Sequence, residues 1–189
     1  MKGKDKHYLP FKKQQNILIY GGVNIVAIQG IQQPEILQID EETRLKKFDG
    51  IYDFAFDWYQ DIETVYMVDG ARTPYSQETL KCMYEWLDKQ GELYFIEVMK
   101  EGKYIPIGDV TFWKDDMPIV IGDKSYRGKG IGKKVIRSLM ERGKSLGYDT
   151  LHINEIYEFN VASRKCFESL GFNAYEKTEK GNRFVLNLL

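Results

Sequence analysis

The stretch Tyr126-Arg127-Gly128-Lys129-Gly130-Ile131-Gly132 carries the strongest structural signal in the chain. It follows the apolar, β-branched segment Met117–Gly122 and opens a segment, Gly130–Gly147, in which apolar residues recur at helical spacing. The pattern therefore predicts a strand, a glycine-rich turn and a helix. Free N–H groups and the macrodipole at a helix start attract anions, and glycine lets a phosphate approach the backbone closely. We expect a phosphate-binding turn.

The spacing of the glycines separates the known kinds of phosphate-binding turn. A Walker A loop needs Gly-x-x-x-x-Gly-Lys-Ser/Thr, but Gly132-Lys133 is followed by Lys134. A dinucleotide fingerprint, Gly-x-Gly-x-x-Gly, would place its third glycine at Lys133. The turn does fit Arg-x-x-Gly-x-Gly, with Arg127, Gly130 and Gly132.

A second motif lies about thirty residues further on, where Asn160-Val161-Ala162-Ser163 precedes Leu170-Gly171-Phe172. With both motifs at this spacing, the chain resembles the GNAT superfamily of acyl-CoA-dependent N-acyltransferases from about residue 34 to its end. A weaker similarity joins Trp58-Tyr59-Gln60-Asp61, followed by Val65, to the aminoglycoside and ribosomal-protein N-terminal acetyltransferase branches.

The resemblance implies an α+β fold of three layers (α/β/α), with a central mixed, mostly antiparallel, splayed sheet flanked by helices. The periodicity adds a helix over Gln77–Gln90 and two helical pieces within Glu41–Tyr59, broken at Gly50. Two apolar runs around Gly21-Gly22 predict a β-hairpin. We therefore divide the chain into an N-terminal extension with this hairpin, residues 1–33, and an acetyltransferase-like domain, residues 34–189.

The resemblance also implies a site for acetyl-CoA as co-substrate. The backbone amides of the turn would hold the pyrophosphate, the exposed backbone at the end of the preceding strand would pair with the pantetheine arm, and Asn160 would hydrogen-bond that arm. The cofactor-binding residues expected on this basis are Ile121, Gly122, Asp123, Arg127, Gly128, Lys129, Gly130, Ile131, Gly132, Asn160 and Ser163.

Catalysis in this superfamily is usually direct attack of an amine on the thioester, which needs no metal. An alkyl ammonium with a pKa of ~10.4 lies about 4.6 kcal/mol from its neutral form at pH 7, so a base or a desolvating pocket must help. Asp109 is the first candidate for the base, ahead of Asp123 and Glu155. Phe167 stands where many relatives carry the tyrosine that protonates the leaving thiolate, and Tyr157 is the candidate substitute.

The acceptor is inferred from charge. Residues 35–101 are strongly acidic, and Asp53, Asp57, Asp61, Glu63 and Asp69 accompany Trp58, Tyr59 and Tyr66. Carboxylates and aromatic faces suit an ammonium group, so we expect the primary amine of a small cationic molecule. A protein N-terminal acetyltransferase and a non-catalytic acyl-CoA-binding module remain alternatives.

Composition narrows the remaining classes. The 189 residues carry a net charge of −1 and 43% hydrophobic residues, which predicts a folded domain without a nucleic-acid partner. No apolar run is long enough to cross a membrane and no secretory signal is apparent, so we expect a cytoplasmic protein. Cys82 and Cys166 are too far apart in sequence to suggest a metal site, and Cys166 has no nearby histidine to activate it. A homodimer is left open.

Overall fold

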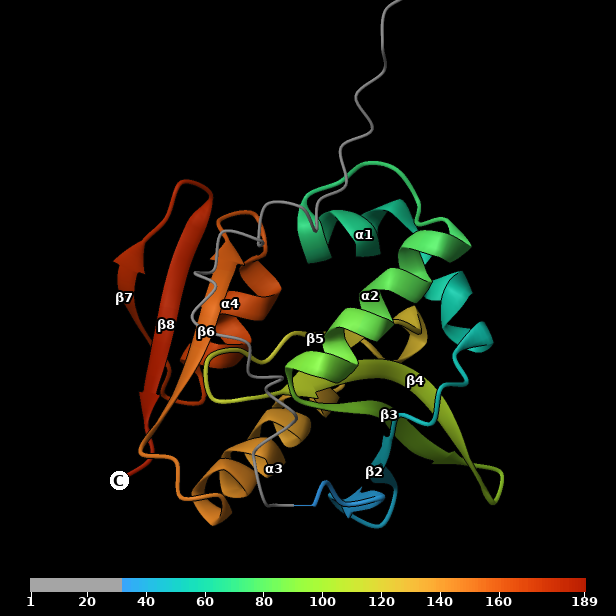
Figure 1. Cartoon of the computed structure of the whole chain (residues 1–189), viewed down its shortest axis with the longest axis horizontal. Coiled ribbons are helices and arrows are strands. Elements are labelled where there is room, and N and C mark those ends of the chain that lie inside the picture. The colour runs from blue at the N-terminus through green and yellow to red at the C-terminus, as the bar shows by residue number, and fades with distance from the viewer. Residues whose placement is uncertain (1–31) are drawn as a thin grey trace, which may run out of the picture.

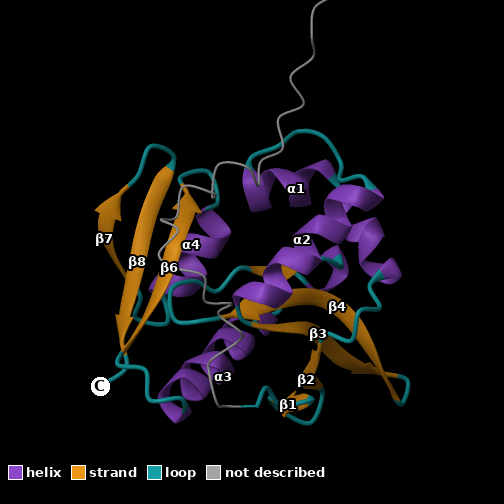
Figure 2. Cartoon of the chain, viewed as in Figure 1, coloured by secondary structure: helices purple, strands orange, loops and turns teal. Residues whose placement is uncertain are grey.

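The computed structural model describes residues 32–189, which form two antiparallel sheets with helices on both faces (Figure 1). The predicted hairpin around Gly21-Gly22 lies outside these residues. The α+β class and the layered arrangement are confirmed (Figure 2). Every hydrogen-bonded strand pair among the described residues is antiparallel.

The larger sheet has the strand order β1-β2-β3-β4-β5 and the smaller one β6-β8-β7. The strands of the larger sheet are β1 (Ile36–Gln38), β2 (Thr43–Lys47), β3 (Glu92–Lys100), β4 (Lys103–Phe112) and β5 (Ile119–Ile121). Those of the smaller sheet are β6 (Thr150–Tyr157), β7 (Asn173–Lys177) and β8 (Gly181–Asn187).

The splay predicted for the sheet falls between β5 and β6, which share no ladder. The connection after β4 bridges the two sheets at one end: His152 N–H donates to the Lys114 carbonyl (2.9 Å), and Asn154 N–H donates to Asp116 Oδ1 (3.2 Å). Beyond Asn154 the strands separate, which opens the space used by the candidate site.

Helices cover the two faces of the sheets. They are the 3-10 helices η2 (Asp53–Tyr59) and η3 (Lys124–Tyr126) and the α-helices α1 (Ile62–Asp69), α2 (Gln77–Gln90), α3 (Ile131–Ser145) and α4 (Val161–Glu168). One buried cluster joins α2 and η2 to Leu93 and Phe95 on one face of β3. The other joins α3 and α4 to Tyr94 and Ile96 on the opposite face. The alternation along β3 therefore builds both halves of the core.

The structure corrects the helix predicted at Glu41–Gly50. Leu45 pairs with Ile96 in β2, where Thr43 and Leu45 are buried, so the period of two outweighs the apparent helical spacing of Leu45 and Phe48. Gly50 does interrupt the segment, with φ +85°, and a short 3-10 helix follows. Helix α2 begins and ends as predicted: the Ser76 hydroxyl accepts from Thr79 N–H, and Gly91 follows its last residue.

Candidate active site

The glycine-rich turn links β5 to the start of α3. Gly128 and Gly130 have φ values of +73° and +80°, a conformation that side chains rarely adopt, and a Cβ on either would meet no atom within 4 Å. Gly130 is the N-cap of α3 and supplies no side chain to the first-turn N–H groups, which have no acidic neighbour in that turn. The open turn and its unsatisfied donors fit an anionic group such as a pyrophosphate.

The side chain of Arg127 points away from this anion site. Its Nε donates to the Ile121 carbonyl (2.8 Å) and one of its Nη atoms donates to Thr64 Oγ1 (2.7 Å). Arg127 therefore ties the end of β5 to α1. Arg127 can therefore contribute to cofactor binding only through its backbone amide and its positive charge.

The end of β5 offers less free backbone than the expected segment Ile121–Asp123. Asp123 N–H donates to the Ile107 carbonyl (3.0 Å), and the Asp123 carboxylate caps η3 through Ser125 N–H (2.9 Å). Gly122 is buried against the Trp58 ring. Because Pro118 pairs with β4 through its carbonyl, the alternation of the ladder turns the backbone groups of Ile119 and Ile121 toward the gap. Because the Ile121 carbonyl already accepts from Arg127 Nε, the edge available to a ligand is the backbone of Ile119 and the Ile121 N–H.

A cavity of about 1200 Å³ lies between the separated strands and reaches the glycine turn. The predicted cofactor-binding and catalytic residues that line it are Asp109, Ile121, Arg127, Gly128, Gly130, Gly132, Glu155, Tyr157, Asn160 and Ser163. Gly122, Asp123, Lys129 and Ile131 do not: Lys129 lies over the Tyr126 ring (5.1 Å), and Ile131 is buried in the core. The structure thus brings most, but not all, of the expected residues to one cavity.

Asn160 is engaged within the protein at both ends of its amide. Its Oδ1 accepts from Ser163 N–H (3.1 Å) as the N-cap of α4, and its Nδ2 donates to the Met67 carbonyl of α1 (3.0 Å). The expected bond from Asn160 to the pantetheine arm therefore competes with contacts that already hold α1 to α4. Ser163 supplies a backbone donor to this cap.

Asp109 lies on β4, 97% buried, with its carboxylate at the cavity wall. The hydroxyls of Tyr59 and Tyr84 both donate to Oδ2, each at 2.9 Å, while Oδ1 accepts no hydrogen bond from residues 32–189. Burial raises the pKa of Asp109 to about 6, although both tyrosine hydrogen bonds act to lower it. The result is a carboxylate with one restrained oxygen, one available oxygen, and a pKa close to neutrality.

Tyr157 at the end of β6 is half-buried and lines the same cavity. Burial raises the pKa of its phenol, and the charges of Glu155 and Asp69 raise it further, so the hydroxyl stays protonated at neutral pH. Phe167, at the position of the missing tyrosine, packs edge-on against Phe172 with ring centroids 5.1 Å apart. Phe167 has no proton to donate, so Tyr157 stays the candidate proton donor at this cavity.

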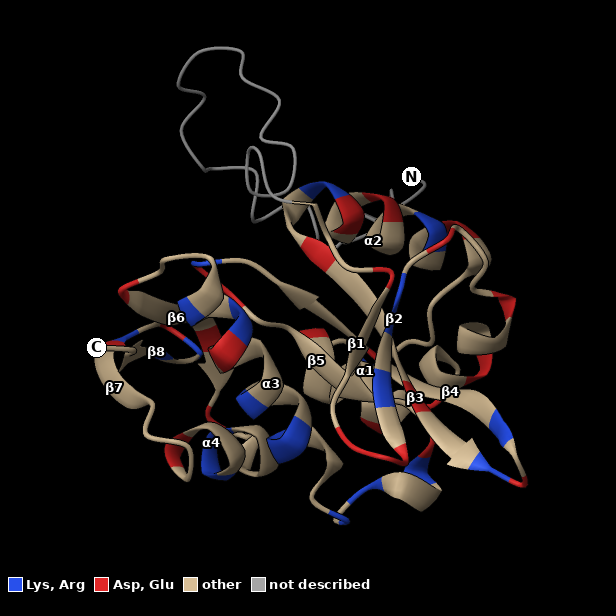
Figure 3. Cartoon of the chain, turned by 90° about the horizontal axis from the view of Figure 1, so that it is seen from below, with Lys and Arg blue, Asp and Glu red and all other residues tan. Residues whose placement is uncertain are grey.

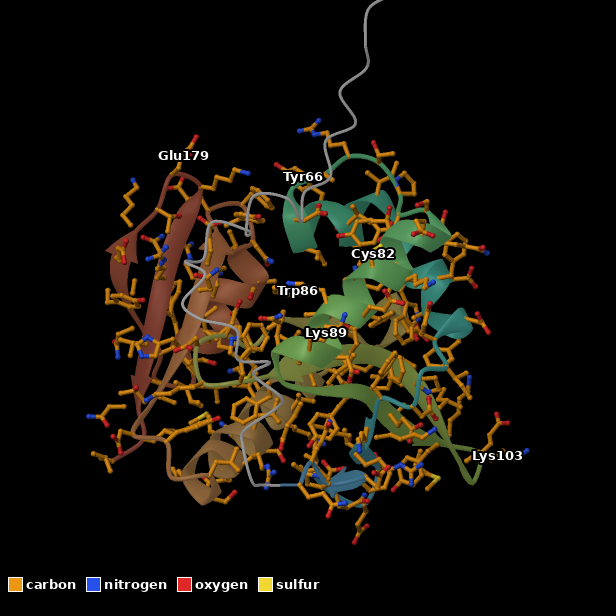
Figure 4. The ribbon with its side chains drawn as sticks, in the orientation of Figure 1. Tyr66, Cys82, Trp86, Lys89, Lys103 and Glu179 are labelled. Carbon is orange, nitrogen blue, oxygen red and sulfur yellow. The ribbon has the colours of Figure 1, made fainter. Side chains whose placement is uncertain are left out.

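Of the five acidic side chains expected at an acceptor site, only Glu63 and Asp69 line the cavity. Asp61 caps α1 and pairs with Lys124. Among the three expected aromatic residues, Tyr59 lines the cavity, Trp58 packs on Gly122, and Tyr66 stacks on Phe159 at 4.2 Å. Figure 4 shows Tyr66 on α1, and Trp86 on the side of α2 that faces the smaller sheet.

The sequence analysis gave no role to three residues of the site. Tyr75 lines the cavity, and Tyr84 lies behind its wall and donates its hydroxyl to Asp109. Asp116 also lines the cavity, and burial raises its pKa to about 6. The signal that could have identified Tyr84, and the contact of Tyr59 with Asp109, is a phenol hydroxyl on a buried helix face, since a buried phenol requires a hydrogen-bond partner.

Other reactive side chains add no further centre to the described part of the chain. Cys166 lines the cavity, and burial raises the pKa of its thiol, which disfavours the nucleophilic thiolate. His152 stacks edge-on with Tyr175, 5.8 Å between centroids. No group of three or more potential ligands for a metal ion occurs within residues 32–189, and none of the helices there is long and apolar enough to cross a membrane.

The amino-acid sequence of the chain is similar to those of known proteins. Residues 52–172 match the model of the acetyltransferase (GNAT) family. An uncharacterized protein of Methanocaldococcus jannaschii is 31% identical over 102 residues, which cover 51% of this chain and 20% of that protein. The chain thus spans about a fifth of the length of that curated relative.

Solved structures share the fold at low sequence identity. A domain from Methanocaldococcus jannaschii gives a TM-score of 0.67 at 22% identity, covering 78% of this chain and 99% of that one. An acetyltransferase from Salmonella typhimurium that modifies the N-terminal serine of ribosomal protein L7/L12 gives 0.62 at 17% identity, covering 81% and 99%. An aminoglycoside acetyltransferase in complex with coenzyme A gives 0.61 at 17% identity, covering 77% and 94%.

Proposed function

Because the chain belongs to the acetyltransferase (GNAT) family, we propose that it transfers an acetyl group from acetyl-CoA to the primary amine of a small cationic molecule by direct attack. The observation that carries the proposal is the available oxygen of Asp109, held by two tyrosine hydroxyls at the wall of a cavity that continues to the glycine turn. One cavity thereby joins a base to an anion site.

The residues at the glycine-turn end of the cavity fit coenzyme A, which carries the acetyl group. The space beside Gly128 and Gly130, which any Cβ would enter, leaves room for a pyrophosphate, and Lys133 and Lys165 add positive charge at this end of the cavity. Figure 3 shows basic segments on α3 and α4. Two solved structures with this fold contain coenzyme A, which supports the same assignment here.

Bound acetyl-CoA supplies the thioester, whose carbonyl carbon gains a bond to nitrogen as its bond to sulfur breaks. Asp109 Oδ1 takes the proton that the ammonium loses before attack and then releases it to solvent, and the second proton that the nitrogen loses as the amide forms also passes to solvent. Tyr59 and Tyr84 hold the carboxylate in position through Oδ2. The Tyr157 hydroxyl, kept protonated by its surroundings, donates a proton toward the departing sulfur. Solvent then restores the proton on Tyr157.

The test is a search for product with purified protein, acetyl-CoA and a panel of primary amines, in which free thiol and acetylated amine are both quantified. We expect equal amounts of thiol and product, and loss of both in Asp109→Asn. If acetyl-CoA binds but no amine, including peptide N-termini, is acetylated, the chain is a binding module. A preference for peptide N-termini over small amines would instead favour a protein N-terminal acetyltransferase.

A further inference from the structure

The acidic charges that line the cavity lie mainly at one end. The end near α3 and α4 carries Lys133 and Lys165, whereas the end near α1 and β6 carries Asp69, Asp109 and Glu155 beside the cations Arg127 and Lys180. None of these three carboxylates forms an ion pair with a lysine or arginine in the described part of the chain, although Asp61 and Glu63 nearby both pair with Lys124. Buried or half-buried negative charge without a cation is costly, so this end is suited to a cationic ligand.

Two stacked tyrosines connect the base to a second carboxylate. The rings of Tyr59 and Tyr75 are 5.2 Å apart and nearly parallel, and Tyr75 N–H donates to the Tyr59 carbonyl (3.0 Å). Tyr59 donates its hydroxyl to Asp109 (2.9 Å), and Tyr75 donates its hydroxyl to Asp69 (2.7 Å). The pair therefore fixes two separate carboxylates relative to one another, both at the cavity wall.

Tyr157 and Glu155 complete the surroundings of the second carboxylate. Burial raises the pKa of Tyr157, followed by the charges of Glu155 and Asp69, so both carboxylates lie within electrostatic reach of this ring. The Thr178 hydroxyl donates to Glu155 Oε1 and restrains it. Lys180 lies over the Tyr157 ring at 5.7 Å and is the positive charge that partly offsets this group. Figure 4 shows the neighbouring Glu179 at the β7–β8 turn, which borders the cavity.

We propose that Asp69 and Glu155 form a subsite for a second ammonium group, so that the acceptor is a diamine or polyamine whose reacting nitrogen lies at Asp109. This inference rests on the proposed transferase function and names its substrate class. The second nitrogen is held by two restrained carboxylates, which suit an ammonium group. The Tyr157 ring beside them already contacts Phe159 (5.1 Å) and Lys180 (5.7 Å). A monoamine of the same length can reach Asp109 but leaves the subsite unfilled.

The experiment compares kcat/KM for α,ω-diamines with that for monoamines of equal carbon number, using acetyl-CoA as donor. We expect native protein to prefer the diamine at least tenfold at its best chain length. Asp69→Asn and Glu155→Gln should each lower the diamine-to-monoamine ratio about tenfold, because each removes one charge from the subsite. Glu158→Gln is the matched control: this exposed carboxylate just after β6 pairs with Lys177, does not line the cavity and should leave the ratio unchanged.

If native protein uses diamines and monoamines equally well, the proposed subsite for a second ammonium group is wrong, while the transferase function stays intact. The same conclusion follows if both variants, shown to be folded by circular dichroism, keep the native ratio. If no amine is acetylated at all, the proposed function itself fails. Lys180→Gln should change the diamine-to-monoamine ratio in the opposite direction. Removing this positive charge should raise the ratio, and a fall in the ratio would contradict the assignment.

Discussion

The hydroxyl of Tyr84 on α2 donates to Oδ2 of Asp109 on β4 across 2.9 Å. This contact joins the helix layer to the sheet at a buried carboxylate that lines the cavity and has one oxygen without a hydrogen bond from residues 32–189. The oxygen without a hydrogen bond, together with a pKa of about 6, is what a general base at this position requires.

Removing the charge of Asp109 should affect turnover more than cofactor binding. We expect Asp109→Asn to lower kcat/KM for the amine about 10²–10⁴-fold, which is the usual contribution of a positioned general base. Acetyl-CoA affinity should change less than about threefold, since Asp109 lies away from the glycine turn. Steady-state kinetics and calorimetry measure the two effects. An equal loss in both would indicate a folding defect and contradict a role as base.

The pH dependence should report the same group. Asp109 must be ionised to accept a proton, so log kcat/KM should rise with unit slope below pH ~6 and level off above it. The plateau should last until the amine itself loses its proton near pH 10. Asp116→Asn is the control, because burial raises the pKa of Asp116 to about 6 as well. A break near 6 that disappears in Asp116→Asn but persists in Asp109→Asn would assign it to Asp116 instead.

Tyr59 and Tyr84 should set the pH at which the activity profile breaks, because both donate to Asp109. Each hydrogen bond to the carboxylate lowers the pKa of Asp109, so Tyr59→Phe and Tyr84→Phe should each move the break in the pH profile above 6. Activity at pH 7 should fall, while activity at pH 8 should recover in part. Profiles measured from pH 5 to 9 test this shift. A break that stays in place or moves below 6 in both variants would show that the hydroxyls do not act on the group that titrates.

Gly122 gives a prediction about stability. A Cβ at this position would lie 2.2 Å from the Trp58 ring, so Gly122→Ala should lower the free energy of unfolding by about 1–3 kcal/mol through overpacking. In the double variant Gly122→Ala/Trp58→Leu, the smaller leucine side chain replaces the indole and should relieve the clash. Denaturant unfolding of the two single variants and the double variant tests the coupling. Strict additivity of the single effects would exclude direct contact between Gly122 and Trp58.

Features that depend on neighbouring residues in the sequence could be predicted, whereas features that depend on contacts between distant residues could not. The glycine turn and α2 depend on local chemistry, namely positive φ at Gly128 and Gly130 and the Ser76 cap, and both could be predicted. The strand Thr43–Lys47 could not, because its conformation is decided by pairing with β3. The tyrosines around Asp109 come from η2 and α2, and only tertiary packing brings them to β4.

The same distinction applies to the cofactor and acceptor sites. Motif spacing identified the turn, but it could not show that the Arg127 side chain points back to Ile121 or that Asn160 is engaged by Met67. Of the acidic stretch, Asp69 and Glu63 line the cavity, and the cationic acceptor stays a prediction. Asp61 instead serves as a cap, a role fixed by the start of α1 that charge counting does not distinguish.

The most direct test of the account is calorimetric titration of acetyl-CoA into native protein and Gly132→Phe, with Lys144→Phe as control on the same helix. Gly132 lines the cavity and a Cβ there meets only Cys166 Sγ at 3.9 Å, so the backbone tolerates a side chain whose ring would fill the anion site. We predict one binding site in native protein and the control, and loss of at least tenfold in affinity in Gly132→Phe. Folded native protein that binds neither acetyl-CoA nor free coenzyme A would contradict the proposed donor site.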